Sequence, residues 1–323
     1  MTLLKVEDLK MHFPVYGGVL YRQVATVFAV DGVSFSVEAG KTMGLVGESG
    51  CGKSTIGRAL LRLYEPTSGR VSFEDKDITH LKGRKLRDLR SDMQMIFQDP
   101  FESLNPRHTI GDILQEPYII HHQGKPAERR QEVLKLLDRV GMPADSIHKY
   151  PHEFSGGQRQ RIGIARAIAL KPKLIICDEP VSALDVSIQS QILNLLIELQ
   201  QEMGMAYMFI AHDLSVIKHV SDQIAVMYLG RIVEIADSET LYANPQHPYT
   251  RALISSIPEP DPRKRKNFTA LKGEVPSPMN PPSHCHFVDR CPYSQPLCSE
   301  KTPLLTVKGT NENHRVACHF ALN

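Results

Sequence analysis

Residues 42–55, TMGLVGESGCGKST, decide the fold of this chain. The apolar run from Thr42 to Val46 predicts a short buried strand that leads into a glycine-rich loop, and a helix is expected from Lys53 to Leu63. The loop fits the pattern G-x-x-x-x-G-K-[ST], in which glycines let backbone N–H groups converge on phosphates. Because a strand precedes it and a helix follows it, a phosphate-binding loop is favoured over a glycine-rich turn that matches by chance.

The residues of this phosphate loop have separate expected roles. Lys53 is placed to reach the β- and γ-phosphate oxygens of a nucleoside triphosphate, and the Ser54 hydroxyl is placed to bind Mg²⁺. The residues expected to surround the phosphates are Gly47, Ser49, Gly50, Cys51, Gly52, Lys53, Ser54 and Thr55.

A second apolar run, KLIICDE at residues 173–179, ends in two carboxylates. Its continuous hydrophobicity is typical of a strand inside a parallel sheet. At the end of such a strand, Asp178 is placed to help hold the metal ion and Glu179 to polarise the attacking water. An isolated Asp-Glu pair is more often a simple capping pair, but beside a phosphate loop the pair favours nucleoside triphosphate hydrolysis.

Strands and helices alternate around these motifs. Residues 1–40 show short alternating patches that predict antiparallel strands joined by glycine turns. The signal is helical over 98–170, and a helix over 187–203 precedes a strand over 205–212, so an α/β domain is expected. Prolines become frequent after about residue 250; they exclude a regular core there and indicate a domain boundary.

The composition excludes several functional classes. With 41% hydrophobic and 23% charged residues and a formal net charge of +2, the 323-residue chain gives no reason to expect nucleic acid or anionic lipid as its main partner. No apolar run is long enough to cross a bilayer, and acidic residues interrupt the N-terminus where a signal peptide would lie. A cytoplasmic chain is therefore expected, and its six cysteines are not expected to form disulfides.

A second candidate anion site lies in FSGGQRQRIGIARA, residues 154–167. Ser155 is placed as the N-cap of a helix whose first N–H groups no side chain covers, and such a helix end attracts anions. One γ-phosphate cannot be held both by the phosphate loop and by this helix across an inserted helical region of the same chain. The second anion is therefore expected to belong to another molecule.

Six elements follow one another in an order that resembles the nucleotide-binding subunits of ATP-binding cassette (ABC) transporters. They are the phosphate loop, Gln98 in FQDP, the signature Ser155-Gly156-Gly157-Gln158, Asp178-Glu179, SALD at 182–185, and His212. The resemblance implies an α/β fold with a P-loop (RecA-like) ABC ATPase core, an antiparallel β subdomain and an inserted helical subdomain over about 99–170. The ABC domain is expected over residues 1–250, with a small irregular, metal-binding extension over 251–323.

The resemblance also implies a head-to-tail pair of such domains, in which the signature of one closes on the ATP held by the other. The residues that would contact the partner's ATP are Ser155, Gly156, Gly157 and Gln158. Gln98 would contact Mg²⁺ and the attacking water, and Asp185 would lie at the dimer seam. His212 would hydrogen-bond the γ-phosphate.

Adenine stacking is expected from an aromatic residue near the N-terminus. Phe13 is the candidate that the resemblance implies. The stretch PVYGGVLYRQVATV, residues 14–27, looks like an insertion, so Tyr16, Tyr21 or Phe28 could take this role instead.

The tail resembles the C-terminal extension of the oligopeptide/dipeptide subgroup of ABC import ATPases, through QHPYTRALISSIP (246–258) and GEVPSPMNPPSHCHFVDRCPYSQPLC (273–298). Four cysteines there suit a [4Fe–4S] cluster or an all-thiolate zinc site: Cys285, Cys291, Cys298 and Cys318. The resemblance favours the cluster. Mixed zinc ligation with nearby histidines (His284, His286, His314, His319) and free thiols are the alternatives. A metal would stabilise a short segment that buries little core.

The resulting hypothesis is the ATP-hydrolysing subunit of a multi-subunit importer, peripheral on the cytoplasmic face of the inner membrane. Its cofactors are ATP, Mg²⁺ and the [4Fe–4S] cluster, with zinc as the alternative. Its expected partners are a paralogous ABC ATPase subunit or a second copy, two transmembrane permease subunits and, indirectly, an extracytoplasmic substrate-binding protein. Peptides are the preferred cargo, with nickel or sugars as alternatives.

Two rival functions are weaker. A soluble ABC ATPase of DNA repair would need a long coiled coil between Lys53 and Asp178, and there is no room for one. A translation ATPase usually carries two cassettes, and one is found. An iron or redox sensor, in which hydrolysis is secondary, is a further rival that the tail keeps open.

Overall fold

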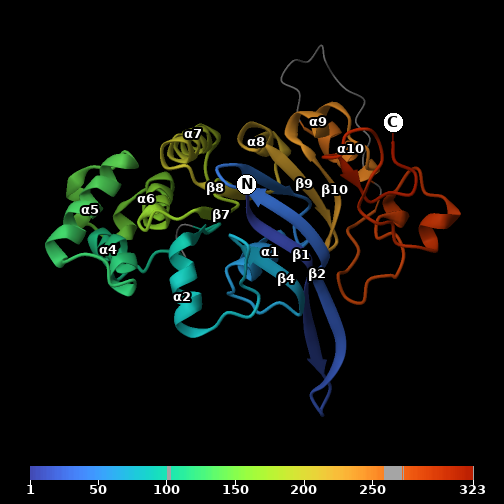
Figure 1. Cartoon of the computed structure of the whole chain (residues 1–323), viewed down its shortest axis with the longest axis horizontal. Coiled ribbons are helices and arrows are strands. Elements are labelled where there is room, and N and C mark those ends of the chain that lie inside the picture. The colour runs from blue at the N-terminus through green and yellow to red at the C-terminus, as the bar shows by residue number, and fades with distance from the viewer. Residues whose placement is uncertain (100–102, 258–270, 272, 323) are drawn as a thin grey trace. The chain divides into compact units, whose positions relative to one another are not determined.

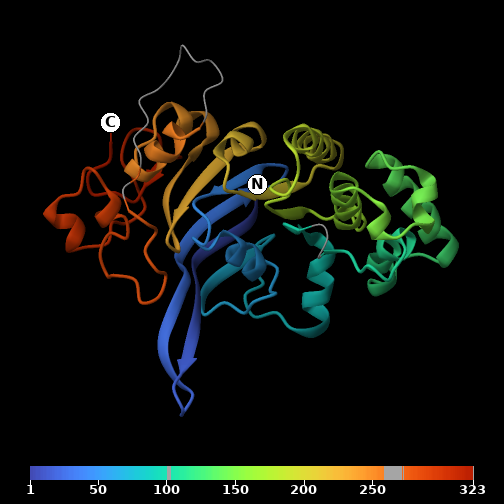
Figure 2. The ribbon, with the colours of Figure 1, turned by 180° about the vertical axis from the view of Figure 1, so that it is seen from behind.

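The computed structural model describes residues 1–99, 103–257, 271 and 273–322, and the chain divides into two compact units. The first unit contains Met1, Val37–Lys41 and Leu81–Ile210. The second unit contains Thr2–Ser36, Thr42–His80 and Ala211–Asn323. Figures 1 and 2 show the elements of both units, and each unit is described by itself.

The first unit is built on three parallel strands in the order β6, β7, β8. They comprise Met93–Ile96 (β6), Leu174–Asp178 (β7) and Ala206–Ala211 (β8). The register pairs Ile96 with Cys177 and Asp178 with Ile210. Every residue of β7 and β8 is buried, as expected for strands of a parallel sheet covered on both faces. Both strands therefore confirm the expectation from sequence.

Helices make up most of the rest of the first unit. They are α2 (Gly83–Asp92), α4 (Ile110–Ile120), α5 (Pro126–Arg139), α6 (Gly156–Ile168) and α7 (Val186–Met203), with 3₁₀ turns at Ala144–His148 and Pro151–Glu153. Helices α4, α5 and α6 pack against one another, side by side in Figure 1. Val133 and Leu137 lie on the buried face of α5, as their spacing predicts. Pro100, at the end of the FQDP motif, lies outside the described residues.

A mixed sheet forms the centre of the second unit. Its strands are β3 (Thr42–Val46), β9 (Gln223–Tyr228), β10 (Arg231–Asp237), β12 (Arg315–Val316) and β11 (Thr306–Val307), in the order β3, β9, β10, β12, β11. Strand β3 runs parallel to β9, and the remaining pairs are antiparallel. The helices of this unit are α1 (Lys53–Leu60), α8 (Leu214–Val220), α9 (Ser238–Ala243) and α10 (Pro248–Ser255).

Helix α1 begins at Lys53, as predicted, but ends at Leu60 rather than at Leu63. The reason lies just beyond it, where Arg62 adopts a positive φ of 54°. A left-handed residue cannot continue a right-handed helix, so the helix stops one turn early.

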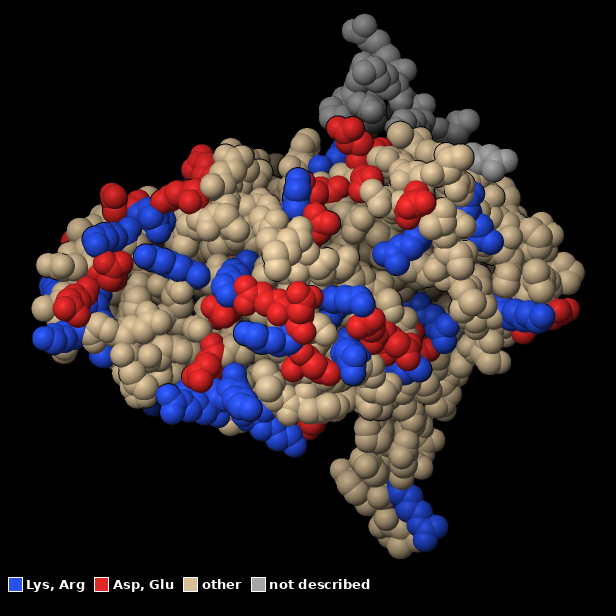
Figure 3. All heavy atoms as spheres, viewed as in Figure 1, with Lys and Arg blue, Asp and Glu red and all other residues tan. Residues whose placement is uncertain are grey.

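A separate antiparallel sheet contains β1 (Thr2–Gly17), β2 (Arg22–Glu38), β4 (Ser68–Phe73) and β5 (Lys76–Asp77), in the order β2, β1, β4, β5. Strands β1 and β2 form one long hairpin rather than several short strands. Its far end exposes apolar side chains, including Val19 and Leu20. Figure 3 shows this end as uncharged except for one basic side chain, and Arg22 is the one Lys or Arg between Lys10 and Asp31.

The C-terminal segment lies along the second unit at several places. The backbone N–H of Phe28 donates to the Pro278 carbonyl, and that of Asn280 donates to the Thr26 carbonyl. Farther on, β12 pairs with β10, where Val316 faces Glu234. The tail is irregular over most of its described residues, and β11 and β12 within it are strands of two residues each. A two-residue strand needs no core of its own when it pairs with a strand that is already in place.

The proline-rich stretch is described only in part, because residues 258–270 lie outside the described chain. The ABC domain over 1–250 and the extension over 251–323 stay predictions. Among the helices described, none has the length and apolar character needed to cross a bilayer.

Candidate nucleotide site

Glycines at both ends of the phosphate loop are required by the backbone around them. Gly47 has a φ of 157°, and a Cβ there would lie 2.1 Å from the Met227 carbonyl oxygen. Gly52 has a φ of 107°, and a Cβ there would lie 1.9 Å from the Ala29 carbonyl oxygen. Any larger residue would push against fixed backbone, so the loop is held tightly between β2 and β9.

Lys53 is buried and lies at the start of α1. Its Nζ atom donates to the carbonyl oxygen of Gly47 at 2.7 Å and to that of Glu48 at 3.0 Å. An ammonium group this deeply buried, with 4% of its residue surface exposed, is costly unless anions or carbonyl oxygens surround it. Together with the positive end of α1, it makes the loop a site for a negatively charged group.

Cys51 is held in the loop by two backbone hydrogen bonds. The Cys51 N–H donates to the Glu48 carbonyl at 3.3 Å, and the Gly230 N–H donates to the Cys51 carbonyl at 3.0 Å. Cys51 is buried, and burial raises the pKa of its thiol. Its side chain therefore packs inside the loop as a neutral group.

Glu48 is held by two residues that the sequence did not single out. Its N–H donates to the Tyr249 hydroxyl at 2.9 Å. Its carboxylate accepts two hydrogen bonds from the Arg290 guanidinium, at 2.7 and 3.0 Å. No short motif signals either contact, because both partners are about two hundred residues or more away along the chain.

In the first unit, Asp178 and Glu179 lie at the carboxyl end of β7. Asp178 is 1% exposed. Glu179 follows it with a φ of 46°, an uncommon left-handed conformation for a residue other than glycine. Its N–H donates to the Ile210 carbonyl at 2.9 Å, and the Ser182 hydroxyl donates to the Glu179 carbonyl at 3.1 Å. These bonds stabilise the turn and set the direction in which the Glu179 side chain leaves the sheet.

The structure brings together Gln98 and Glu179, which were each expected near the attacking water. The Gln98 amide donates to the Glu179 carboxylate at 3.0 Å. Gln98 follows β6 by two residues, and β6 and β7 are parallel neighbours. The carboxyl ends of adjacent parallel strands meet at one edge of a sheet, which explains why residues distant in sequence lie in contact here.

Ser155 caps α6, as predicted. Its hydroxyl accepts from the Gln158 N–H at 3.4 Å, and the Gln158 side chain accepts from the Ser155 N–H at 3.0 Å. A Cβ added to Gly157 would lie 2.6 Å from the Ile188 side chain, whereas one added to Gly156 would meet its nearest atom, on Leu184, at 3.5 Å. The fold of the chain itself therefore leaves room for a side chain at Gly156.

Asp185 and His212 are both exposed. Asp185 occupies the N-cap position of α7, and His212 directly follows β8.

The aromatic candidates for adenine stacking differ in their surroundings. Phe13 packs edge-on against Tyr64, with ring centroids 5.7 Å apart. Tyr16 and Tyr21 stack on each other at 5.2 Å near the end of the hairpin, and Phe28 lies 4.2 Å from the His12 ring. Phe13 stays the prediction for this role.

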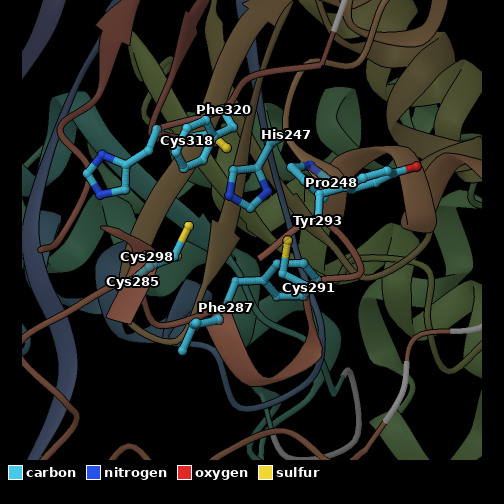
Figure 4. Close-up of a pocket in the computed structure, with 11 residues that line it drawn as sticks. His247, Pro248, Cys285, Phe287, Cys291, Tyr293, Cys298, Cys318 and Phe320 are labelled. Atoms are coloured by element: carbon cyan, nitrogen blue, oxygen red, sulfur yellow. The ribbon is translucent and has the colours of Figure 1, made fainter. Parts of the chain in front are cut away.

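The four tail cysteines line one pocket, together with His247 (Figure 4). The pocket volume is about 10 Å³, room for roughly one water molecule. All four cysteines are free thiols. Burial raises the pKa of Cys285 and Cys291, and that of Cys318 to about 11. Burial lowers the pKa of His247 to about 4, so its ring is neutral.

The chemistry of these donors fits a soft metal or an iron–sulfur cluster, because four thiols converge on one small pocket. Within the described part of the chain, no three His, Cys, Asp or Glu side chains are grouped so that they could hold a metal ion.

Two family models match this chain, one in the region of the nucleotide motifs and one in the C-terminal region. A family model described as "ABC transporter" matches residues 30–182, which include the phosphate loop, Gln98, the signature and Asp178-Glu179. A second model, described as "Oligopeptide/dipeptide transporter, C-terminal region", matches residues 233–298, which include three of the four tail cysteines.

Solved structures support the fold. The chain is similar to the dimeric structure of the ATP-binding cassette MJ0796 in a post-hydrolysis state with ADP and Pi, with a TM-score of 0.65 and 26% identity. That match covers 73% of this chain and 99% of the other. It confirms the ABC ATPase fold expected from the sequence.

Curated relatives match over nearly the whole chain. The oligopeptide transport ATP-binding protein AppF of Bacillus subtilis is 53% identical, over 99% of this chain and 97% of its own length. The oligopeptide transport ATP-binding protein OppF of Salmonella typhimurium is 51% identical, over 98% of this chain and 96% of its own length. With the phosphate loop, the signature helix and the carboxylate edge all in place, this chain belongs to the oligopeptide transport ATP-binding proteins of the ABC transporter family.

Proposed function

We propose that this chain hydrolyses ATP to power the import of short peptides through separate membrane subunits. The observation that carries the proposal is the contact between Gln98 and Glu179 beside the buried Asp178, in a chain that is 53% identical to an oligopeptide transport ATP-binding protein. The chain acts on the cytoplasmic side of the membrane, bound to two permease subunits. An extracytoplasmic substrate-binding protein delivers the peptide to them.

The site residues divide the work of hydrolysis. Lys53 binds the β- and γ-phosphate oxygens, and the backbone of the phosphate loop surrounds them. Ser54 and Asp178, with Gln98, would hold Mg²⁺, which neutralises charge on the phosphates when bound. Glu179 accepts a proton from the attacking water, and Gln98 orients the Glu179 carboxylate through their hydrogen bond. His212 hydrogen-bonds the γ-phosphate, and Phe13 stacks on adenine.

The chain works as half of a head-to-tail pair. The spare room at Gly156 supports this, because the fold itself does not require a glycine there. A closely approaching triphosphate from the partner subunit would require one, and the α6 N-terminus favours its negative charge. Asp185 and its exposed neighbour Val186, which is 78% exposed, lie at the seam of the pair.

Replacement of the proposed base tests this assignment. Glu179→Gln keeps the shape of the side chain but removes its basicity, so ATP turnover should fall by about 10³-fold while ATP still binds. The variant, mixed with its partner subunit, should form a stable dimer with ATP on size exclusion. Glu202→Gln, at an exposed carboxylate paired with Arg139, is the matched control and should turn over ATP normally. Full turnover by Glu179→Gln would contradict the assignment of the base.

In the tail, Cys285, Cys291, Cys298 and Cys318 would hold a [4Fe–4S] cluster, with zinc as the alternative. The convergence of all four thiols on one pocket supports this proposal. Protein purified without oxygen should be brown, absorb at roughly 400 nm and contain about four irons per chain. Cys291→Ser should lose the colour, whereas Cys177→Ala, at a buried cysteine outside the pocket, should keep it. Colourless protein that contains zinc would contradict the cluster.

A further inference from the structure

The phosphate loop is braced at Glu48 by the C-terminal region. Tyr249 accepts a hydrogen bond from the Glu48 N–H, and Arg290 binds the Glu48 carboxylate with both terminal nitrogens. Glu48 is also the residue whose carbonyl accepts a hydrogen bond from Lys53. Both bracing residues therefore act on the segment of the loop that positions the phosphate-binding lysine.

The contact between Arg290 and Glu48 is largely shielded from water. The Arg290 side chain is 6% exposed and that of Glu48 is 27% exposed. The Arg290 guanidinium also lies 5.8 Å from the centre of the Tyr228 ring. A bidentate ion pair that is largely shielded from water is stronger and more rigid than an ion pair on the surface. Loss of either partner leaves the charge of the other poorly compensated.

The position of Arg290 is itself fixed by its neighbours in the tail. Phe287 packs edge-on against Tyr228 at 5.2 Å and lies 5.5 Å from the Tyr249 ring. The His286 Nδ1 atom donates to the Leu229 carbonyl at 3.1 Å. Arg290 therefore belongs to a packed segment, and this packing fixes its position beside the phosphate loop.

The charge of Glu48 explains why this brace matters. Its carboxylate belongs to a loop that receives a highly negative triphosphate, and a bare carboxylate there would repel the ligand. We propose that Arg290 is a positioning residue of the nucleotide site, which neutralises Glu48 and holds the loop in its binding conformation. The C-terminal region thereby sets the affinity of the chain for ATP.

The test measures the Kd of ATP for the full-length chain by competition with a fluorescent ATP analogue. Arg290→Met, which removes the charge but keeps most of the length, should raise the Kd by about tenfold. Adding Glu48→Gln to this variant removes the unpaired carboxylate and should restore the Kd to within about twofold. Arg290→Lys keeps the charge without the two-pronged geometry and should give an intermediate Kd. Arg70→Met, which breaks an exposed pair with Asp77 in the same unit, is the matched control and should leave the Kd unchanged.

The salt dependence of the Kd distinguishes an electrostatic role of Arg290 from a structural one. The penalty of Arg290→Met should shrink when the salt concentration rises from about 0.1 to about 1 M, because screening weakens the repulsion by Glu48. A loss caused by damaged packing would not shrink in this way. If Arg290→Met does not fold, Arg290→Lys carries the test, and an unchanged Kd in folded Arg290→Lys then contradicts the proposal.

Two results would overturn the proposal. One is an unchanged Kd in folded Arg290→Met, and the other is no recovery in the double variant. Arg290 can act in this way only if the phosphate loop binds ATP, as proposed above. Lys53→Ala is therefore the reference variant. If Lys53→Ala still binds ATP, the proposed nucleotide site fails; if it loses ATP while Arg290→Met does not, only the role of Arg290 fails.

Discussion

The phosphate loop and the signature turn are both glycine-containing segments at the start of a helix, but they are constrained in different ways. At Gly52 an added Cβ would lie 1.9 Å from a backbone oxygen of the same unit, whereas at Gly156 the nearest atom would lie at 3.5 Å. Gly52 has a left-handed φ, and Gly156 does not. Gly52 of the loop is required by its own fold, and Gly156 of the signature is not.

The residues that shape the phosphate loop all come from one chain, whereas the proposed anion site at the signature turn needs a second subunit. The loop has its lysine, its helix end and its bracing residues within one compact unit. The signature turn has a helix end capped by its own serine and an exposed surface. The proposed pair of subunits supplies a reason for glycine at Gly156, because the partner's triphosphate would approach it closely.

Replacement of Gly52 or Gly156 by alanine tests this difference most directly and has the largest expected effects. Gly52→Ala forces backbone apart and should cost about 3 kcal/mol of stability and reduce ATP affinity by at least about 100-fold. Gly156→Ala should leave stability and ATP binding by the isolated chain unchanged, yet reduce turnover by the assembled pair by about 100-fold. Thermal unfolding, nucleotide titration and steady-state hydrolysis measure the three quantities. Equal loss of ATP binding in both variants would remove the distinction.

Ser155 sharpens the comparison at a smaller scale. Ser155→Ala removes the cap of α6 and should lower the free energy of unfolding by about 1 kcal/mol. Ser155→Asp keeps a capping oxygen but presents a carboxylate to the partner's phosphate. It should therefore retain stability in chemical unfolding while the assembled pair loses turnover. Normal turnover by Ser155→Asp would show that no anion reaches this helix end.

The smallest expected effect concerns the ion pair of Asp31 and Arg231. Burial acts to raise the pKa of Asp31, but the hydrogen bond and charge of Arg231, and then those of His12, hold it below its usual value. A lowered carboxyl pKa stabilises the fold above the unfolded-state pKa, and this stabilisation is lost as the pH falls through the folded-state pKa.

Unfolding by denaturant at about pH 6 and about pH 3 measures this loss. Asp31→Asn should reduce the difference between the two pH values by no more than about 1 kcal/mol, because solvent screens the pair. An identical acid dependence in Asp31→Asn would assign the loss of stability to other carboxylates.

Much of the fold could be predicted because its decisive signals are local. The strand before Gly47, the buried run that ends at Asp178 and the serine cap of α6 each depend on neighbours within a few residues. The start of α1 at Lys53 follows from the same kind of signal. The early end of α1 was missed because the conformation of Arg62 is set by tertiary packing rather than by propensity.

The contacts that the sequence did not predict are the long-range ones. Arg290 and Tyr249 show no pattern that points to Glu48, because a side-chain ion pair between distant segments leaves no periodicity in the sequence. The same holds for β12, whose two residues pair with β10 across about eighty residues. The resemblance to a known family placed Gln98 and Glu179 near the same water, but it did not predict the hydrogen bond between them.

Arg290 and Cys291 are consecutive residues, so the residue that binds Glu48 of the phosphate loop is the chain neighbour of a residue that lines the thiol pocket. Two coupled equilibria affect each other equally. If a reversible change at one site alters the affinity of the other site for its ligand, the bound ligand alters the equilibrium of that change by the same factor. A reversible change at Cys291 that displaced Arg290 would weaken ATP binding, and bound ATP would then oppose that change. The affinity of this subunit for ATP would thus depend on the chemical state of Cys291 in its tail.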